Sequence, residues 1–166
     1  LFRSVYSVPA DGSSDPKNLT AKNEAWDAWP VPSPDGKTLY YLAMKRPTFE
    51  ADRFGIMALD LASGETREVS PQWDRSAGSL RISIDGKTLY VTADDNGEHP
   101  LFAGDAKSGK VRKIAGEGNI GGYDVAGSTL VFARDTLKAP ADLFAAGTDG
   151  GKAHRLTTLN ADKLRD

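Results

Sequence analysis

The sequence contains 166 residues, of which 39% are hydrophobic and 27% are charged, and its formal net charge at pH 7 is −2. A chain of this length can bury roughly 70% of its unfolded surface, and 17 glycines and 9 prolines indicate a soluble, turn-rich globular protein rather than a disordered or fibrous one. The small net charge and the lack of a long lysine and arginine cluster argue against nucleic acid as a partner.

The composition also excludes several kinds of site. Cysteine is absent, which removes disulfides, thiol catalysis and thiolate metal sites and is compatible with any compartment. No stretch approaches the roughly 18 apolar residues that a membrane-spanning helix needs. Position 1 is a leucine inside a strand-like pattern, with no initiator methionine or signal peptide, so we expect an internal piece of a longer protein. We predict no cofactor.

The first part of the chain alternates short apolar segments with turns. Alternating apolar and polar side chains predict a half-buried strand over residues 1–8, and a turn then leads to a short partner at 17–20. A charged loop, 45–53, interrupts the pattern further on. The remaining strands of this part are expected, in chain order, at 26–31, 38–44, 54–61 and 65–69.

The same order of four strands then recurs along the rest of the chain. Strands are expected at 79–83, 88–93, 100–105 and 110–114 and, more weakly marked, at 121–125, 129–134, 141–146 and 154–158. No stretch has the spacing of an amphipathic helix.

One stretch is copied almost unchanged. Residues 33–40 read Ser-Pro-Asp-Gly-Lys-Thr-Leu-Tyr, and residues 83–90 repeat seven of these eight positions. Each copy places Asp-Gly between two β-rich runs, which predicts a hairpin with a primed turn, because glycine adopts positive φ freely. Gly36 and Gly86 are 50 positions apart and Gly127 follows 41 positions later. A four-stranded antiparallel unit at this spacing is typical of a β-propeller blade.

We therefore predict an all-β fold, a partial β-propeller of about three and a half four-stranded antiparallel blades. Its expected units are a half blade at 1–20, full blades at 26–70, 73–115 and 119–159, and an exit linker at 160–166. The alternative, a single β-sandwich, explains the short strands but not near-identical turns at blade spacing. Propellers close with four to eight blades, so the chain is expected to form an arc.

Several segments resemble a known family. Residues 33–42 resemble the propeller repeat that periplasmic propellers share with the prolyl oligopeptidase family of serine peptidases. Four more segments, followed by Leu-Thr-Thr-Leu-Asn at 156–160, are similar to the bacterial acylaminoacyl peptidase and dipeptidyl aminopeptidase branch of that family. They read Phe-Glu-Ala-Asp-Arg-Phe at 49–54, Asp-Leu-Ala-Ser-Gly-Glu at 60–65, Trp-Asp-Arg-Ser at 73–76 and Pro-Ala-Asp-Leu-Phe at 140–144.

The resemblance implies a function without catalysis in this chain. In that family a propeller caps an α/β-hydrolase domain that follows it and carries the catalytic Ser, Asp and His. This chain would then gate or position peptide substrates for a downstream hydrolase domain, toward which residues 160–166 would lead. No serine here lies in Gly-x-Ser-x-Gly, the turn that exposes such a nucleophile, so we expect no catalytic residue and no peptidase activity in the chain alone.

The two histidines and one acidic cluster are alternative candidate sites. His99 follows a polar loop and His154 precedes an arginine on an expected outer strand, and both are interpreted as solvated side chains. Asp94, Asp95 and Glu98 offer oxygens for a divalent cation. They lack the spacing of a known calcium loop, so a solvated hairpin tip is the preferred interpretation and no metal site is predicted.

The charged loop 45–53 supplies the candidates for substrate contact. Phe49 lies among Glu50, Asp52, Arg53 and Arg46, which together could form an ion-pair network or bind a charged substrate end. The resemblance adds that acidic propeller residues of aminopeptidases in the family bind the free amino terminus of the substrate.

Two further expectations remain. The alternative function is a protein- or ligand-binding propeller module of a translocation-type periplasmic protein, with no hydrolase attached. The open arc is also expected to self-associate, because a terminal blade lacks a neighbour and would leave apolar side chains partly uncovered. The side chains expected there are Leu130, Phe132, Leu143 and Phe144.

Overall fold

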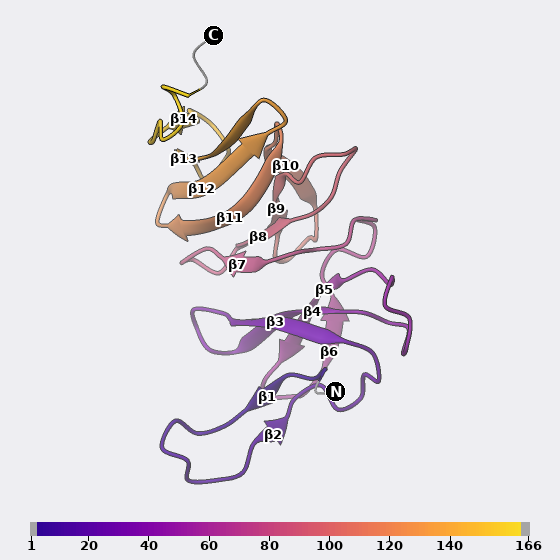
Figure 1. Ribbon diagram of the computed structural model, residues 1–166. Coiled ribbons are helices and arrows are strands. Elements are labelled where there is room, and N and C mark those ends of the chain that lie inside the picture. The colour runs from indigo at the N-terminus through magenta and orange to yellow at the C-terminus, as the bar shows by residue number, and fades with distance from the viewer. Residues whose placement is uncertain (1–2, 164–166) are drawn as a thin grey trace.

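The computed structural model describes residues 3–163, which form four antiparallel sheets and no helix (Figure 1). The half-blade pairs β1 (Tyr6–Ser7) with β2 (Lys17–Asn18). The first blade contains β3 (Asp27–Pro32), β4 (Thr38–Ala43), β5 (Gly55–Asp60) and β6 (Thr66–Glu68); the second contains β7 (Leu80–Ile82), β8 (Thr88–Thr92), β9 (Leu101–Asp105) and β10 (Val111–Ala115); the third contains β11 (Asn119–Ala126), β12 (Thr129–Thr136), β13 (Ala139–Gly147) and β14 (His154–Arg155).

Each blade is a meander in which consecutive strands are neighbours, and this confirms the predicted fold class. The blades follow one another along the molecule, from the half-blade near the N-terminus to the third blade near the C-terminus (Figure 1). β7 contacts both β3 and β11, so the first strands of the three blades lie together along one side of the arc, which we call the inner side. Two ends of expected elements, Leu1-Phe2 and residues 164–166, lie outside the described residues.

Local hydrogen bonds explain why the hairpin was copied so faithfully. In the first copy the Ser33 hydroxyl donates to Asp35 Oδ1 (2.6 Å), and the amides of Lys37 and Thr38 donate to Asp35 and Ser33. The second copy repeats all three bonds with Ser83 and Asp85. The serine and aspartate oxygens thus bind turn amides locally, which favours both residue types in this turn.

The predicted primed turn is wrong in one respect. Gly36 and Gly86 have positive φ (69° and 72°), as expected, but the aspartates before them do not. A type I′ turn requires positive φ at both central residues. The Gly36 amide instead donates to the Ser33 carbonyl (2.9 Å), which closes a type I-like turn that the glycine then ends. The five residues that connect β3 to β4 leave room for this turn, whereas primed turns suit two-residue loops.

The apolar core lies between blades. One cluster joins the first and second blades around Leu42, Leu80 and Leu89, and another joins the second and third blades around Leu101, Ile120 and Phe132. A smaller cluster joins the half-blade to the first blade through Val5, Leu39, Tyr41, Ala43 and Leu59. Because side chains alternate across a strand, each sheet contributes one apolar face to each of its neighbours.

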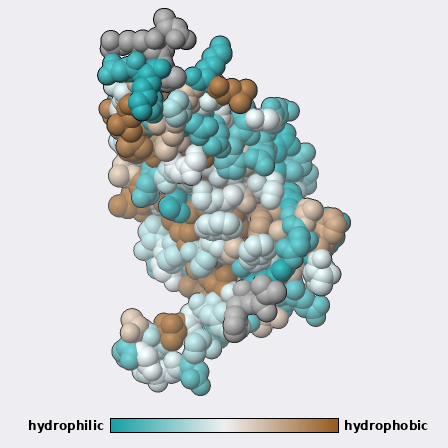
Figure 2. Space-filling model, viewed as in Figure 1, coloured by the Kyte–Doolittle hydropathy of each residue, from teal (hydrophilic) through white to brown (hydrophobic). Residues whose placement is uncertain are grey.

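The expectation that four apolar side chains of the third blade are partly uncovered is wrong for three of them. Leu130, Phe132 and Phe144 are at most 6% exposed, because they face the second blade. Leu143 lies on the opposite face and is 43% exposed. Figure 2 shows apolar surface over this end of the molecule. The predicted self-association, which stays a prediction, would therefore involve Leu143 together with the exposed Leu156 and Leu159.

Glycines mark the seams between blades. In the C-terminal turn of the second blade, a Cβ added to Gly109 would collide with the carbonyl oxygen of Val69 in the first blade. Gly150 of the third blade approaches the carbonyl of Ile114 in the same way. Gly64, the corresponding residue of the first blade, has no such neighbour within 4 Å. The turn of each later blade therefore packs directly on the backbone of the preceding one, and the half-blade lacks this contact.

Candidate functional site

The charged loop 45–53 leaves β4 and returns to β5, and Asp52 holds it closed. The amides of Lys45 and Arg46 donate to Asp52 Oδ2 (2.7 and 2.8 Å), and the Arg46 side chain donates to Oδ1 (3.1 Å). Burial alone would raise the pKa of Asp52, but these donors outweigh it and lower the pKa to about 2. Asp52 is therefore ionised at neutral pH and committed to the loop.

Arg53 and Lys45 fix the loop to the outer strand of the blade. Both donate to the carboxylate of Glu68, whose side chain is only 10% exposed, and Arg53 also donates to the carbonyl of Trp73. Burial would raise the pKa of Glu68, yet the two cations hold it below the ordinary value. This network ties the loop to β6 and to the start of the second blade.

Glu50 and Phe49 point outward from the same loop. The Glu50 side chain is 62% exposed and accepts a hydrogen bond from Arg3 (2.6 Å). Phe49 is 44% exposed, and the Arg46 guanidinium lies 3.9 Å from its ring centre. Of the four residues predicted from the sequence, Arg46, Asp52 and Arg53 thus act on the loop itself, and Glu50 presents its carboxylate to solvent.

An aromatic cluster adjoins this loop, and sequence reasoning did not identify it as a site. Trp26 and Trp29 both meet Phe54 edge to face, with ring centres 5.5 and 6.2 Å apart. The Arg3 guanidinium lies 5.3 Å from the Trp26 ring while it binds Glu50, so Arg3 connects the cluster to the loop. The signal that could have found it is the proline after Trp29, since proline within a strand marks an edge or a bulge.

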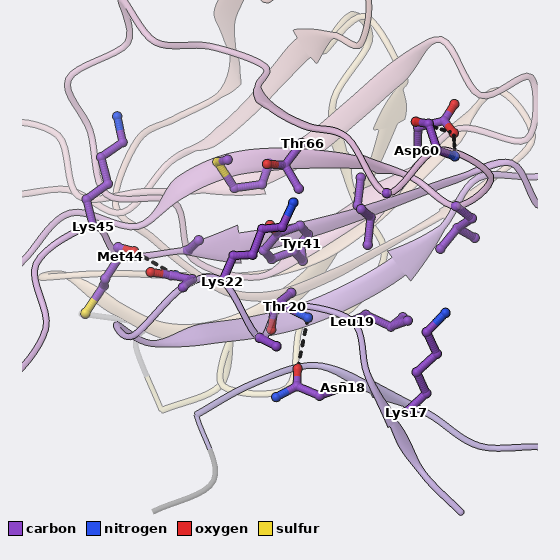
Figure 3. A pocket seen from close by; sticks show the side chains of 18 residues that line it. Lys17, Asn18, Leu19, Thr20, Lys22, Tyr41, Met44, Lys45, Asp60 and Thr66 are labelled. Carbon is purple, nitrogen blue, oxygen red and sulfur yellow. Dashed lines mark hydrogen bonds between the residues drawn. The ribbon is translucent and has the colours of Figure 1, made fainter. Parts of the chain in front are cut away.

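A cleft of about 460 Å³ separates the half-blade from the first blade. Its walls combine apolar residues with lysines, and Figure 3 shows Lys17 and Lys45 on opposite margins with Tyr41 between them. Among the residues that the structure describes, none of the four predicted site residues lines this cleft. Figure 2 shows the half-blade as a projection from the rest of the molecule. This agrees with the lack of a close contact between the Gly64 turn of the first blade and the half-blade backbone.

A buried carboxylate lies beside the cleft. Asp27 is 4% exposed; its Oδ1 accepts a hydrogen bond from Asn23 (2.7 Å), whereas its Oδ2 has no partner. Burial raises the pKa of Asp27. Burial and the nearby Asp27 charge raise the pKa of Tyr41 to about 12. Burial therefore disfavours the charged forms of both side chains.

The histidines and the acidic cluster have separate partners. His99 Nδ1 is 2.7 Å from Asp94 Oδ1, and His154 Nδ1 is 3.2 Å from a backbone carbonyl. Asp95 binds Arg75 and Lys113, and Glu98 accepts the amide of Gly118. Within residues 3–163 no three His, Cys, Asp or Glu side chains converge in a way that could hold a metal ion. Nor does this part of the chain contain a helix long and apolar enough to cross a membrane.

Comparisons with curated proteins give relatives that are much longer than this chain. Dipeptidyl-peptidase 5 of Porphyromonas gingivalis is 28% identical over 144 residues, which cover 86% of this chain and 21% of that protein. A probable dipeptidyl-peptidase 5 of Emericella nidulans is 36% identical over 144 residues, which cover 80% of this chain and 20% of that protein. The chain thus spans about a fifth of the length of these relatives. No family model matches it.

Solved structures share the fold. The acylaminoacyl peptidase of Pyrococcus horikoshii matches with a TM-score of 0.73 and 23% identity, over 97% of this chain and 24% of that one. The β-propeller domain of the trilobed protease of Pyrococcus furiosus matches with 0.71 and 21%, over 95% and 44%. TolB of Acinetobacter baumannii matches equally well, with 0.72 and 21%, over 94% and 38%.

Proposed function

This chain is a partial β-propeller related in sequence to dipeptidyl-peptidases 5, and we propose that it is the non-catalytic propeller segment of such a serine peptidase. In this role it gates the approach of peptides and positions them for an α/β-hydrolase domain that follows it in the parent chain. The partners are thus the hydrolase domain, which acts as the catalyst, and a peptide substrate.

The sequence relatives carry this proposal. They are dipeptidyl-peptidases from a bacterium and a fungus, and they match at least 80% of this chain while extending far beyond it. The fold alone does not choose a function, because peptidase and TolB propellers match with nearly equal TM-scores of 0.73 and 0.72. The chain also lacks the Gly-x-Ser-x-Gly turn, so catalysis must come from elsewhere in the parent.

The proposal is tested on the gene and on the protein. The reading frame beyond Asp166 is expected to encode an α/β-hydrolase domain with Gly-x-Ser-x-Gly. The enzyme made from the whole frame should hydrolyse dipeptidyl chromogenic substrates and react with a serine-directed fluorophosphonate, whereas this chain alone should do neither. A frame that ends after further blades, or turnover and labelling by this chain alone, would overturn the proposal.

Within this proposal the residues of the charged loop have different roles. Glu50 contacts the substrate, because its carboxylate is the exposed acidic group of the loop and has a second oxygen with which to bind a free amino terminus beside Arg3. Asp52 and Arg53 hold the loop in place through the backbone and Glu68, and Arg46 covers Phe49.

We expect Glu50→Gln in the parent enzyme to raise KM several-fold for substrates with a free amino terminus and to spare kcat and blocked substrates. The reason is that ground-state and transition-state binding of the amino group would be lost together. Asp52→Asn is the matched comparison: it should lower the melting temperature, because the loop loses charged acceptors for two amides. Equal KM values for the wild type and Glu50→Gln would contradict the assignment of Glu50.

The second candidate function is a propeller that binds proteins or other ligands in translocation. The TolB match supports it only to the extent that both classes of propeller share the fold. The same reading frame decides between the two, since this candidate requires further blades or a stop and no nucleophile turn.

A further inference from the structure

We propose that Trp29 is a recognition residue on the inner side of the arc, which binds a bulky apolar or aromatic side chain of an extended peptide. The inference deepens the proposed function, on which it rests for the peptide nature of the ligand. The backbone is strained at this residue. Four described residues other than glycine have positive φ, and Trp29, at 48°, is the one that lies within a strand. A bulky residue in this conformation is an outlier that its surroundings must impose.

The strain arises at a β-bulge. Ala28 pairs with Leu42 and Val31 pairs with Tyr40, so Trp29 and Pro30 together lie opposite the single residue Tyr41. A bulge of this kind changes the direction in which a side chain points. The Trp29 side chain is accordingly 46% exposed, although tryptophan is usually well buried.

The other blades indicate that the fold does not need this tryptophan. In the second blade the Gly78 amide donates to the Thr92 carbonyl (2.7 Å) while Leu80 pairs with Val91, so the extra residue at this step is Ser79, whose small side chain is partly buried. In the third blade the first strand is also bulged, but the unpaired residue is Gly121. A blade can thus be built with serine or glycine at this bulge, so the exposed indole is an addition to the repeat.

The surroundings of Trp29 suit a peptide ligand. Phe54 supports the indole edge to face, at 6.2 Å and 89°, and Phe54 is itself packed against the core between blades. The ring is therefore held without being covered, which limits the entropy lost on binding. β3 is the edge strand of its sheet, but Pro30 lacks an N–H and the Asp27 amide already donates to the Arg3 carbonyl, so what this edge offers an extended peptide is the aromatic surface of Trp29.

The test uses this chain and its indole signals in two-dimensional ¹H–¹⁵N NMR. The sequence contains three tryptophans, so Trp29→Gly identifies the Trp29 indole signal by its loss. The probes are acetyl-Gly-Phe-Gly-amide and, as a control, acetyl-Gly-Ala-Gly-amide. We expect a saturable shift of the Trp29 signal with the phenylalanine peptide, at least fivefold weaker apparent binding of the alanine peptide, and no shift for Trp73, which packs on Phe102.

The variant separates recognition from folding. Because glycine accepts positive φ, Trp29→Gly should melt at the same temperature as the wild type or at a higher one. The variant should nevertheless lose most of its affinity for the phenylalanine peptide. An unmoved Trp29 signal, equal shifts with both peptides, unchanged affinity of the variant, or a variant that fails to fold would each overturn the inference. Its failure would leave the proposed function standing, since that is judged by the reading frame and by hydrolysis.

Discussion

Gly109→Ala is expected to lower the free energy of unfolding by about 3 kcal/mol or more. Two costs add at this position. The backbone is at φ +71°, which costs an L-residue with a Cβ about 1–2 kcal/mol. The methyl group would also collide with the carbonyl oxygen of Val69, a backbone atom of the first blade that cannot rotate away, and overpacking of this kind costs about 1–3 kcal/mol.

The turn of the first blade supplies the control. Gly64 has φ +75° in the same Ser-Gly turn, but no neighbouring atom lies within 4 Å of its added Cβ. Gly64→Ala should therefore lower the free energy of unfolding only by the conformational cost of positive φ, about 1–2 kcal/mol. Urea unfolding followed by circular dichroism and by tryptophan fluorescence measures both variants. Equal losses would show that the seam between blades does not depend on this contact, and Gly150→Ala is expected to behave like Gly109→Ala.

Phe132→Ala is expected to cost about 3–5 kcal/mol, because it leaves a large cavity in the core between the second and third blades. The ring is 1% exposed and stacks on Phe144, with ring centres 5.8 Å apart and planes 13° apart. A loss of this size is a large part of the total free energy of unfolding of a typical domain, which is about 5–15 kcal/mol. Thermal and urea unfolding measure it, and Phe132→Leu should give a smaller loss in a chain that still folds.

Leu143→Ala is the matched control on the same sheet. Leu143 lies on the opposite face and is 43% exposed, so its truncation should cost less than about 1 kcal/mol. If the two truncations to alanine cost the same, the apolar face of the third blade does not lie toward the second blade. The comparison therefore tests which face the neighbouring blade covers.

The sequence was sufficient for the repeat and for the location of the charged loop. The copied hairpin is determined locally, because Ser33, Asp35 and Gly36 satisfy their own turn through bonds and φ values that span a few residues. Strand alternation and turn spacing are local in the same sense, so the all-β blades followed from them. The charged loop was recognisable because charge and length interrupt that pattern.

Tertiary structure decided what the pattern could not. Alternation says that Phe132 and Leu143 lie on opposite faces, but only the position of the second blade says which face is covered. Likewise, the loop sequence does not distinguish Asp52, which the backbone binds, from the exposed Glu50. The bulge that exposes Trp29 and the carbonyl that confines Gly109 depend on strands far away in the chain. Local hydrogen bonds and strand periodicity depend on residues that are neighbours in the sequence. The burial of a side chain and the close approach of two backbone segments depend on parts of the chain that meet only in the folded protein.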